Sequence, residues 1–541
     1  MKKLLFLVCI FLAAKNYSQS VYFPLNHSYN SIIDKQLNAK SNRAHTGMRP
    51  FIYQDIDSVT IDSSFAQFKR QKHLYLLGQS WWSKAALWTE RKLLDEDLFV
   101  LKSEAFKLKI NPLFDFAYGK DTVSEQTTYT NTRGVYLEGQ IGNKFFFNSS
   151  FLESQATLVP YVQYIVASSG VIPGQGRYKG FKKTGYDFNR ASALISYSPN
   201  KYFNFQFGQD KLFIGDGYRS LLLSDNSFNY PFFKVTTKFW KIQYTNIFTQ
   251  LVSAVTALDQ LFPKKFSSSH YLSYNVTQWL NIGLFESIMW SGSNGRGFDF
   301  QYLNPIIFLR PVEYANGSSD NALIGATAKV KLTNKWHLYG QLLMDEFNLS
   351  KVKQDKGWWA NKWGIQAGTK VYDLFNIKNL SAQLEFNMVR PYTYSHNDSL
   401  SNYSNFNQAL AHPLGANFME GLGFLRYNYK RLFFEVRGSY AEYGSDSSIV
   451  NYGQNIFLSY NNNKAKISGE NGEFGHTIAQ GRKNSMYYTD LKVSFLVNPK
   501  TNMRIETGWM RRAQETNTTN NLTQYFYIGF RTALFNYYTD Y

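Results

Sequence analysis

Patterns that could perform catalysis are scarce in this sequence. It lacks the H-E-x-x-H, G-x-S-x-G and phosphate-binding-loop motifs, which set a nucleophile, a base or a metal in a defined context. Its eight histidines are spread from His27 to His476. The single cysteine, Cys9, lies near the start of the chain, which excludes thiolate chemistry and a cysteine-bound zinc beyond it. We predict a protein that is not an enzyme and uses no cofactor or metal; a site assembled from distant strands is the alternative.

Residue types that bind carbohydrate gather instead in two polar stretches, 211–231 and 291–320. Such sites combine aromatic faces that pack on sugar rings, planar polar groups that bond hydroxyls, and cations where the sugar is acidic. For the first stretch the alternative is a structural plug, in which glycines supply positive φ angles. For the second, we prefer ion pairs that lie inside a lumen and brace the loops. The candidate polysaccharide contacts are Asp216, Tyr218, Arg219, Asp225, Asn226, Arg310, Glu313, Asp320 and Asn321.

A third stretch, 154–190, is basic and holds Arg177, Lys179, Lys182 and Lys183. The whole chain shares this bias, with 58 Lys and Arg against 39 Asp and Glu and a formal charge of +19. Attraction to an acidic polysaccharide or to lipopolysaccharide phosphate is the functional interpretation, and a solvated loop is the alternative. A separate aromatic group (Trp358, Trp359 and Trp363) is interpreted as part of an interfacial girdle, with sugar stacking as the alternative.

The first twenty residues predict export. A basic Met1-Lys2-Lys3 start, an apolar run over 4–14 and small residues up to Ser20 form a signal peptide, residues 1–20, with cleavage after Ser20. The apolar run is too short for a membrane-spanning helix. Removal of this leader lowers the formal charge from +19 to +16. Export argues against nucleic acid as a partner despite the basic balance.

The remaining sequence alternates between apolar and polar residues in segments of about ten residues, the length that a tilted strand needs to cross a membrane. Side chains of a strand point alternately to its two faces, so one face meets lipid and the other a polar lumen. Aromatic residues make up 18% of the chain, which suits such a wall. The alternation is visible at 203–210, 380–388, 434–439, 503–509 and 135–141.

Connections between these segments are short and long in turn. Short ones are predicted at 142–144, 198–200, 333–335, 430–431 and 498–500. Long polar ones are predicted at 154–190, 211–231, 253–269, 291–320, 348–360, 395–414 and 445–483. A soluble sandwich or propeller would not pair its loops in this way, and no propeller repeat is visible. The sequence therefore predicts an all-β fold: a large antiparallel transmembrane β-barrel of about 18 strands over residues 105–541, in the outer membrane and in contact with its lipid. The chain ends on Tyr541 after an aromatic strand, which resembles the signal read by barrel-insertion machinery.

The segment 21–104 does not share the alternation. Short helices are predicted at 30–39 and 62–72, and an apolar helical face at 81–94. We predict a partly helical periplasmic segment that packs against the barrel; docking of a partner is the alternative.

Several runs resemble the Wzi-type capsule-assembly family of outer-membrane proteins. They are GQDKLFIGDGYRSLLLSDN at 208–226 followed by Pro231, YLNP at 302–305, GSSDN at 317–321 and YGQLLMDE at 339–346. The resemblance implies an eighteen-stranded barrel with periplasmic helices, whose extracellular face binds capsular or related surface polysaccharide. The aromatic-rich style also resembles the RemB-type gliding-motility members of this family in Bacteroidetes.

Three functions follow as hypotheses. The first is a non-catalytic binder or organiser of surface polysaccharide, which gains avidity from many weak contacts with a repeating polymer. The second is a gliding-motility or surface-adhesion component that works with secreted adhesins or motility proteins. The third is a diffusion channel, which requires an open lumen.

Overall fold

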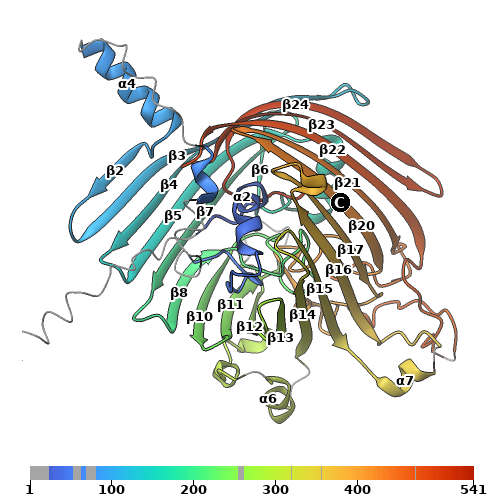
Figure 1. The fold of residues 1–541 in the computed structure, drawn as a ribbon. Helices are drawn as coiled ribbons and strands as arrows, with labels where there is room; N and C mark the ends of the chain where they lie inside the picture. The colour runs from blue at the N-terminus through green and yellow to red at the C-terminus, as the bar shows by residue number, and fades with distance from the viewer. Residues whose placement is uncertain are drawn as a thin grey trace, which may run out of the picture.

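The computed structural model describes residues 23–52, 56, 63–68, 81–253, 261–306, 308–317, 320–354, 356–469 and 471–541. Eighteen antiparallel strands close into a barrel (Figure 1), as predicted. Each strand pairs with the next along the chain, and β24 closes the ring on β3 from Tyr525↔Asp121 to Arg531↔Asp115. The wall strands are β3 (Phe106–Asp121), β4 (Thr127–Ile141), β5 (Phe145–Thr157), β7 (Gly185–Tyr197), β8 (Phe203–Asp210), β10 (Tyr230–Phe239), β11 (Ile242–Val252), β12 (Lys264–Asn275), β13 (Leu280–Ser291), β14 (Asn321–Lys331), β15 (Trp336–Glu346), β16 (Lys362–Tyr372), β17 (Leu380–Val389), β20 (Phe418–Tyr429), β21 (Leu432–Ser445), β22 (Arg482–Asn498), β23 (Met503–Thr516) and β24 (Asn520–Thr532).

The other elements are short and attach to this wall. Strand β2 pairs antiparallel with β3 and β6 with β7, while β1 pairs with β9 and β18 with β19. They are β1 (Met48–Arg49), β2 (Phe99–Lys102), β6 (Lys179–Phe181), β9 (Phe213–Ile214), β18 (Ser404–Asn405) and β19 (Gln408–Ala409). The helices are α2 (His27–Leu37), α4 (Trp81–Leu94), α5 (Pro160–Ser169), α6 (Arg310–Ala315) and α7 (Leu349–Lys353), with 3-10 turns at η3 (Ser293–Gly295), η4 (Phe300–Leu303), η5 (Leu374–Asn376) and η6 (Ser399–Ser401). Over the described ranges, none of the helices has the length and apolar character to cross a membrane.

Alternation sets the two faces of the wall. On β8, Phe203, Phe205 and Phe207 are exposed on the outside, whereas Asn204 and Gln206 between them are buried. On β17, Leu384 and Phe386 are exposed outside, and their neighbours Gln383, Glu385 and Asn387 are buried inside. Apolar side chains therefore cover the outer surface and polar ones line the lumen, which is the arrangement that a lipid environment requires.

The two rims differ as the sequence predicts. The short turns at 142–144, 198–200, 333–335, 430–431 and 498–500 all connect neighbouring wall strands on one side, here called the short-turn rim. The long connections lie at the opposite, long-loop rim, where α6 and α7 project at the bottom of Figure 1, away from α4 at the top. Short turns face the periplasm in outer-membrane barrels, so the long loops face the medium.

The N-terminal segment lies at the short-turn rim. Helix α2 confirms the helix predicted at 30–39, and it ion-pairs with the wall through Lys35–Asp373 at 2.7 Å and Lys370–Asp34 at 2.9 Å. Helix α4 confirms the helix predicted at 81–94. The predicted signal peptide lies outside the described residues, as does much of the helix predicted at 62–72. The contacts of α2 support packing against the barrel.

Two further segments enter the lumen. Residues 211–229, here called the plug loop, join β8 to β10 and are almost entirely buried. The wall itself ends at Thr532, and residues 533–541, here called the C-terminal tail, turn back inside. Tyr541 is thus separated from the last strand by the tail and packs against the lumen core, and its role as an insertion signal stays a prediction.

Candidate functional site

The plug loop is held close to the wall. Leu221 is fully buried, and its backbone N–H donates to Gln341 Oε1 at 2.8 Å. Two glycines permit this approach: a Cβ on Gly215, whose φ is +145°, would lie 2.5 Å from Gln341 Nε2, and a Cβ on Gly217 would lie 2.5 Å from Glu385 Oε2. A larger residue at either position would have to displace the Gln341 or Glu385 side chain, both of which bond to the plug loop.

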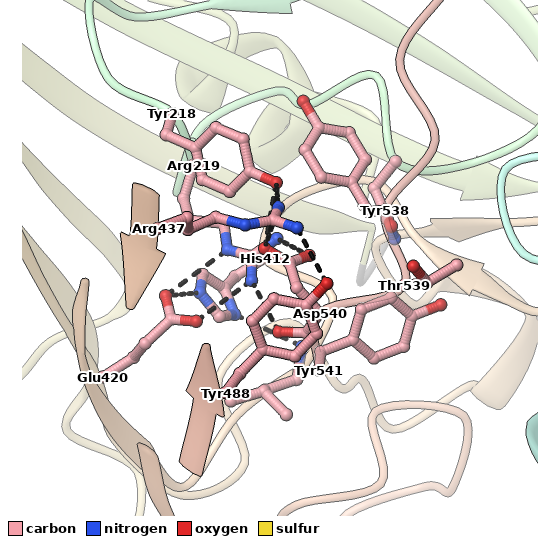
Figure 2. Close-up of polar contacts among 12 residues, drawn as sticks. Tyr218, Arg219, His412, Glu420, Arg437, Tyr488, Tyr538, Thr539, Asp540 and Tyr541 are labelled. Carbon is pink, nitrogen blue, oxygen red and sulfur yellow. Dashed lines mark hydrogen bonds and ion pairs between the residues drawn. The ribbon is translucent and has the colours of Figure 1, made fainter. Parts of the chain in front are cut away.

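Arg219 of the plug loop is the centre of an ionic network (Figure 2). Its guanidinium donates to Glu420 Oε1 on β20 at 3.0 Å and to Asp540 Oδ1 in the C-terminal tail at 3.2 Å. His412 Nε2 lies 2.8 Å from the other oxygen of Glu420. The side chains of Arg219, Glu420 and Asp540 are at most 2% exposed. Arg219 thus ties the plug loop to both the wall and the tail.

Asp540 also binds a second cation, Arg437 of β21. Arg437 Nη1 donates to Asp540 Oδ2 at 2.9 Å, and the Tyr218 hydroxyl donates to the same oxygen at 2.9 Å. Burial by itself raises the pKa of the Asp540 carboxyl, but the charges of Arg219 and Arg437 outweigh it and hold that pKa below its usual range. The tail therefore carries a charged carboxylate into the lumen, between two guanidinium groups.

The other candidates in the plug loop are also buried and bonded within the chain. Asp216 pairs with Lys329 of β14 at 3.3 Å. Asp225 accepts a hydrogen bond from the Tyr538 hydroxyl at 2.7 Å, and Asn226 donates to a backbone carbonyl at 3.2 Å. All five candidate residues of this stretch thus brace the plug loop in the structure. Their contact with a saccharide stays a prediction.

Because Lys211, at the start of the plug loop, is buried, we predict that the free energy of unfolding depends on pH. Its ammonium donates to the carbonyls of Gly174 at 2.7 Å and Asp225 at 3.1 Å. Burial lowers the pKa of Lys211 from 10.5 to about 7, and the charge of Arg190 adds to this shift. Between these two values the unfolded chain binds more protons than the folded chain, so the free energy of unfolding should rise with pH from about 7 to about 10. Urea unfolding in micelles should show this rise. Lys211→Met should reduce its slope, because one of the contributing lysines is lost, while the exposed Lys201→Met should leave the slope unchanged. Equal slopes in all three proteins would contradict the assignment.

The charged residues of the second candidate stretch do not enter the lumen, whereas Asn321, the register partner of Met289 in the lumen core, faces it. Arg310 pairs with Glu313 at 2.9 Å within α6, and Asp320 pairs with Arg296 at 2.7 Å. Asn321, the first residue of β14, donates to a backbone carbonyl at 2.9 Å. The expected pairing of charges is present, but its expected location inside the lumen is wrong, because the apolar side chains of 298–312 pack on the outer face of the wall.

The basic stretch lies on the open surface of the long-loop rim. Arg177, Lys179, Lys182 and Lys183 are all exposed, in and beside the β6–β7 hairpin. Among the predicted polysaccharide contacts, these four cations form the largest exposed group. A ligand in the medium can reach them without any movement of the loops.

A cluster of aromatic and cationic side chains joins two other loops at this rim. The ring centroids of Trp359 and Tyr460 are 5.0 Å apart, and Lys464 Nζ lies 3.9 Å from the centroid of the Trp359 ring, over its face. Trp359 therefore packs between two loops, and its part in a girdle or in sugar stacking stays a prediction. Cations bind in this position because the face of an aromatic ring carries a negative electrostatic potential.

Sequence analysis did not single out Glu420, Arg437 or Asp540. A signal existed for the first two, since each is an ionisable residue at a lumen-facing position of an alternating strand, where a charge needs a partner. No such signal marks Asp540, which follows the last strand. In the part of the chain that the structure describes, no three His, Cys, Asp or Glu side chains are grouped so as to hold a metal ion.

Comparisons with known proteins show a shared fold. No family model and no curated protein sequence matches this chain. Among solved structures, Wzi from Escherichia coli, an outer membrane protein involved in group 1 capsule assembly and a carbohydrate-binding β-barrel, aligns with a TM-score of 0.52 at 12% identity, over 94% of this chain and 98% of its own. OpdK from Pseudomonas aeruginosa, solved with vanillate, aligns with a TM-score of 0.42 at 9% identity, over 78% of this chain and 98% of its own. The closed wall with its apolar outer face and polar lumen places this protein in the outer membrane, and Wzi, an outer membrane protein, shares its fold.

Proposed function

We propose that this protein is a non-catalytic surface-polysaccharide binder of the Wzi type, which works through its long-loop rim. The observation that carries the proposal is the filled lumen: the plug loop, the C-terminal tail and the wall are joined by buried ion pairs at the centre of the barrel. A filled lumen favours a binder over a diffusion channel, because the loops are then the surface left for a ligand. The fold shared with Wzi, itself a carbohydrate-binding barrel, supports the same function.

The exposed basic hairpin is the contact that we propose for an acidic polymer. Arg177, Lys179, Lys182 and Lys183 form a cationic surface around β6. A repeating polyanion would meet this surface at several points and gain avidity from them together. Exposed charges are screened over about 8–10 Å at physiological salt, so this contact should weaken as salt rises.

Charge reversal tests this contact. A variant with Lys179→Glu, Lys182→Glu and Lys183→Glu should retain about a hundredfold less labelled acidic polysaccharide, since each of the three cations contributes about 1 kcal/mol near an anionic surface. A matched control reverses three exposed lysines of the short-turn rim, Lys144, Lys201 and Lys500. Pull-down of the labelled polymer at low and high salt measures the effect. Equal losses in both variants would show that net charge, and not this hairpin, governs retention.

The role in motility is separated from polysaccharide binding by deletion. Cells that lack the gene should lose part of their polysaccharide coat if the proposal holds. Cells that keep the coat and stop spreading on a surface would instead support the RemB-type role with secreted adhesins or motility proteins. Both measurements are made on the same strain, so that each outcome is decisive.

A further inference from the structure

One long connection lies outside the barrel and covers part of the wall. Residues 296–306 and 308–317, here called the outer flap, follow β13 and include η4 and α6, which projects beyond the wall in Figure 1. Leu309 and Tyr302 of the flap are fully buried against Ile288 and Trp290. These two wall residues are outward-facing, because Met289 between them belongs to the lumen core. The flap therefore packs on the outer surface.

Beside these apolar contacts, a group of polar residues beneath the flap breaks the apolar pattern of the outer face. Asn246 of β11 is the register partner of His270 on β12, and His270 is the partner of Glu286 on β13. All three are buried although they point outward. Glu286 lies six residues beyond Leu280, the start of β13 at the short-turn rim. At about 3.3 Å per residue and a tilt of about 40°, this is about 15 Å into an apolar band about 25 Å tall.

Glu286 holds the flap in place. Its carboxylate accepts hydrogen bonds from the backbone N–H groups of Phe308 at 2.6 Å, Leu309 at 2.6 Å and Arg310 at 3.0 Å. These donors lie at the start of α6, where a helix leaves N–H groups unsatisfied and favours a negative charge. Ser268 of β12 adds a bond from its hydroxyl to the carbonyl of Tyr302 at 2.8 Å. Without the flap, the Glu286 carboxylate would face hydrocarbon without these donors, at high cost.

The outer side of the flap restores the apolar surface that the wall lacks here. Ile306, Phe308 and Tyr314 are 66%, 68% and 87% exposed, and Phe300 is exposed beside them. Next to Glu286 on the outer face, its register partner Ile324 of β14 and Leu284, two residues earlier on β13, are exposed apolar residues of the wall. The apolar side of the flap is thus continuous with the surface that meets lipid.

We infer that the outer flap is immersed in the outer leaflet, where its exposed apolar side binds the acyl chains of membrane lipid, and that Glu286 is the residue that positions it. The flap thereby turns a polar section of the wall into a lipid-facing one. This interaction is separate from polysaccharide binding, since the flap residues that would touch lipid are not among the cations of the basic hairpin.

Lipid contact is tested by site-directed fluorescence. Single-cysteine variants Ile306→Cys and Tyr314→Cys, made with Cys9→Ser, are labelled with an environment-sensitive dye and reconstituted in vesicles of phosphatidylcholine with brominated acyl chains. Quenching should equal that at Leu384→Cys on the bare wall and exceed several-fold that at Ile449→Cys in an exposed loop. Quenching as low as at position 449 would overturn the inference. The inference would also be overturned if neither brominated lipid nor aqueous iodide quenched the labels on the flap. That result would indicate that a second copy of the chain covers the flap.

The positioning role of Glu286 is tested in the same vesicles. Glu286→Gln replaces one accepting oxygen with an amide that donates, so the label at position 306 should lose most of its quenching while the label at 384 keeps its own. Glu515→Gln, at an exposed glutamate of β23, is the matched control. Heat-modifiable gel migration verifies that each barrel is folded, which separates loss of the flap from loss of the wall. Unchanged quenching at 306 in a folded Glu286→Gln barrel would overturn the role of Glu286.

Discussion

A chain truncated after Thr532 should conduct ions across a planar bilayer, whereas the intact barrel should not. Truncation removes the C-terminal tail and with it Tyr538 and Asp540, which are buried in the lumen and bonded to the plug loop. Arg219 and Arg437 then lose Asp540, the carboxylate that they share. The two cations repel each other without it, which widens the opening that the tail leaves in the lumen. Single-channel recording of the purified proteins measures the change from a closed to an open lumen.

The control for this experiment lies in the tail itself. Tyr537→Ala changes a side chain that is exposed, unlike those of its neighbours Tyr538 and Asp540, and should leave the lumen closed. Asp540→Asn keeps the length of the tail and removes only its charge, so it should conduct less often than the truncated chain. If the truncated barrel is folded and still does not conduct, the tail is not what closes the lumen. If the intact barrel conducts steadily, the channel hypothesis replaces the proposal of a filled lumen.

The second large effect is expected for Arg219→Met. The substitution preserves most of the side-chain volume and leaves two buried carboxylates, Glu420 and Asp540, each with one cation fewer. Loss of one member of a buried ionic group costs about 3–5 kcal/mol, because the remaining charge stays out of water without its partner. The free energy of unfolding in urea, followed by gel mobility, should fall by that amount.

Two further variants make this result specific. Arg177→Met, at an exposed arginine, should change the free energy of unfolding by less than about 0.5 kcal/mol. Adding Glu420→Gln to Arg219→Met should recover part of the loss, because the second substitution removes the unpaired charge. A midpoint of unfolding that does not move in Arg219→Met would show that the network is not a source of stability.

The two effects have one structural origin, which bears on the proposed function. The same guanidinium that stabilises the plug loop also binds the tail that fills the lumen. Closing the lumen and stabilising the barrel are therefore coupled, and a variant that opens a pore should also unfold more easily. A binder that works from its rim gains a rigid base for its loops from this arrangement.

The wall could be predicted from the sequence because its signals are local. Alternation along β8 or β17 assigns each side chain to lipid or lumen within a few residues, and the short turns at 198–200 and 430–431 mark where the chain reverses. The two-residue alternation of a strand and the residue types of a turn both depend on neighbours in the chain. The number of strands and the difference between the two rims can therefore be read from the sequence. The basic hairpin was also visible, as a run of cations in one long loop.

Only the tertiary structure decided where the long connections go. Tyr218 and Asp540 are 322 residues apart and meet in the lumen, and no pattern near either residue names the other. His270 and Glu286 occupy outward positions where apolar residues are expected, yet this departure has meaning only once the register brings them together under the flap. Whether a loop folds inward or outward depends on the sum of contacts with strands distant in sequence. The alternating pattern by itself therefore determined the cylinder, and three-dimensional packing decided what fills its lumen and what covers its outer face.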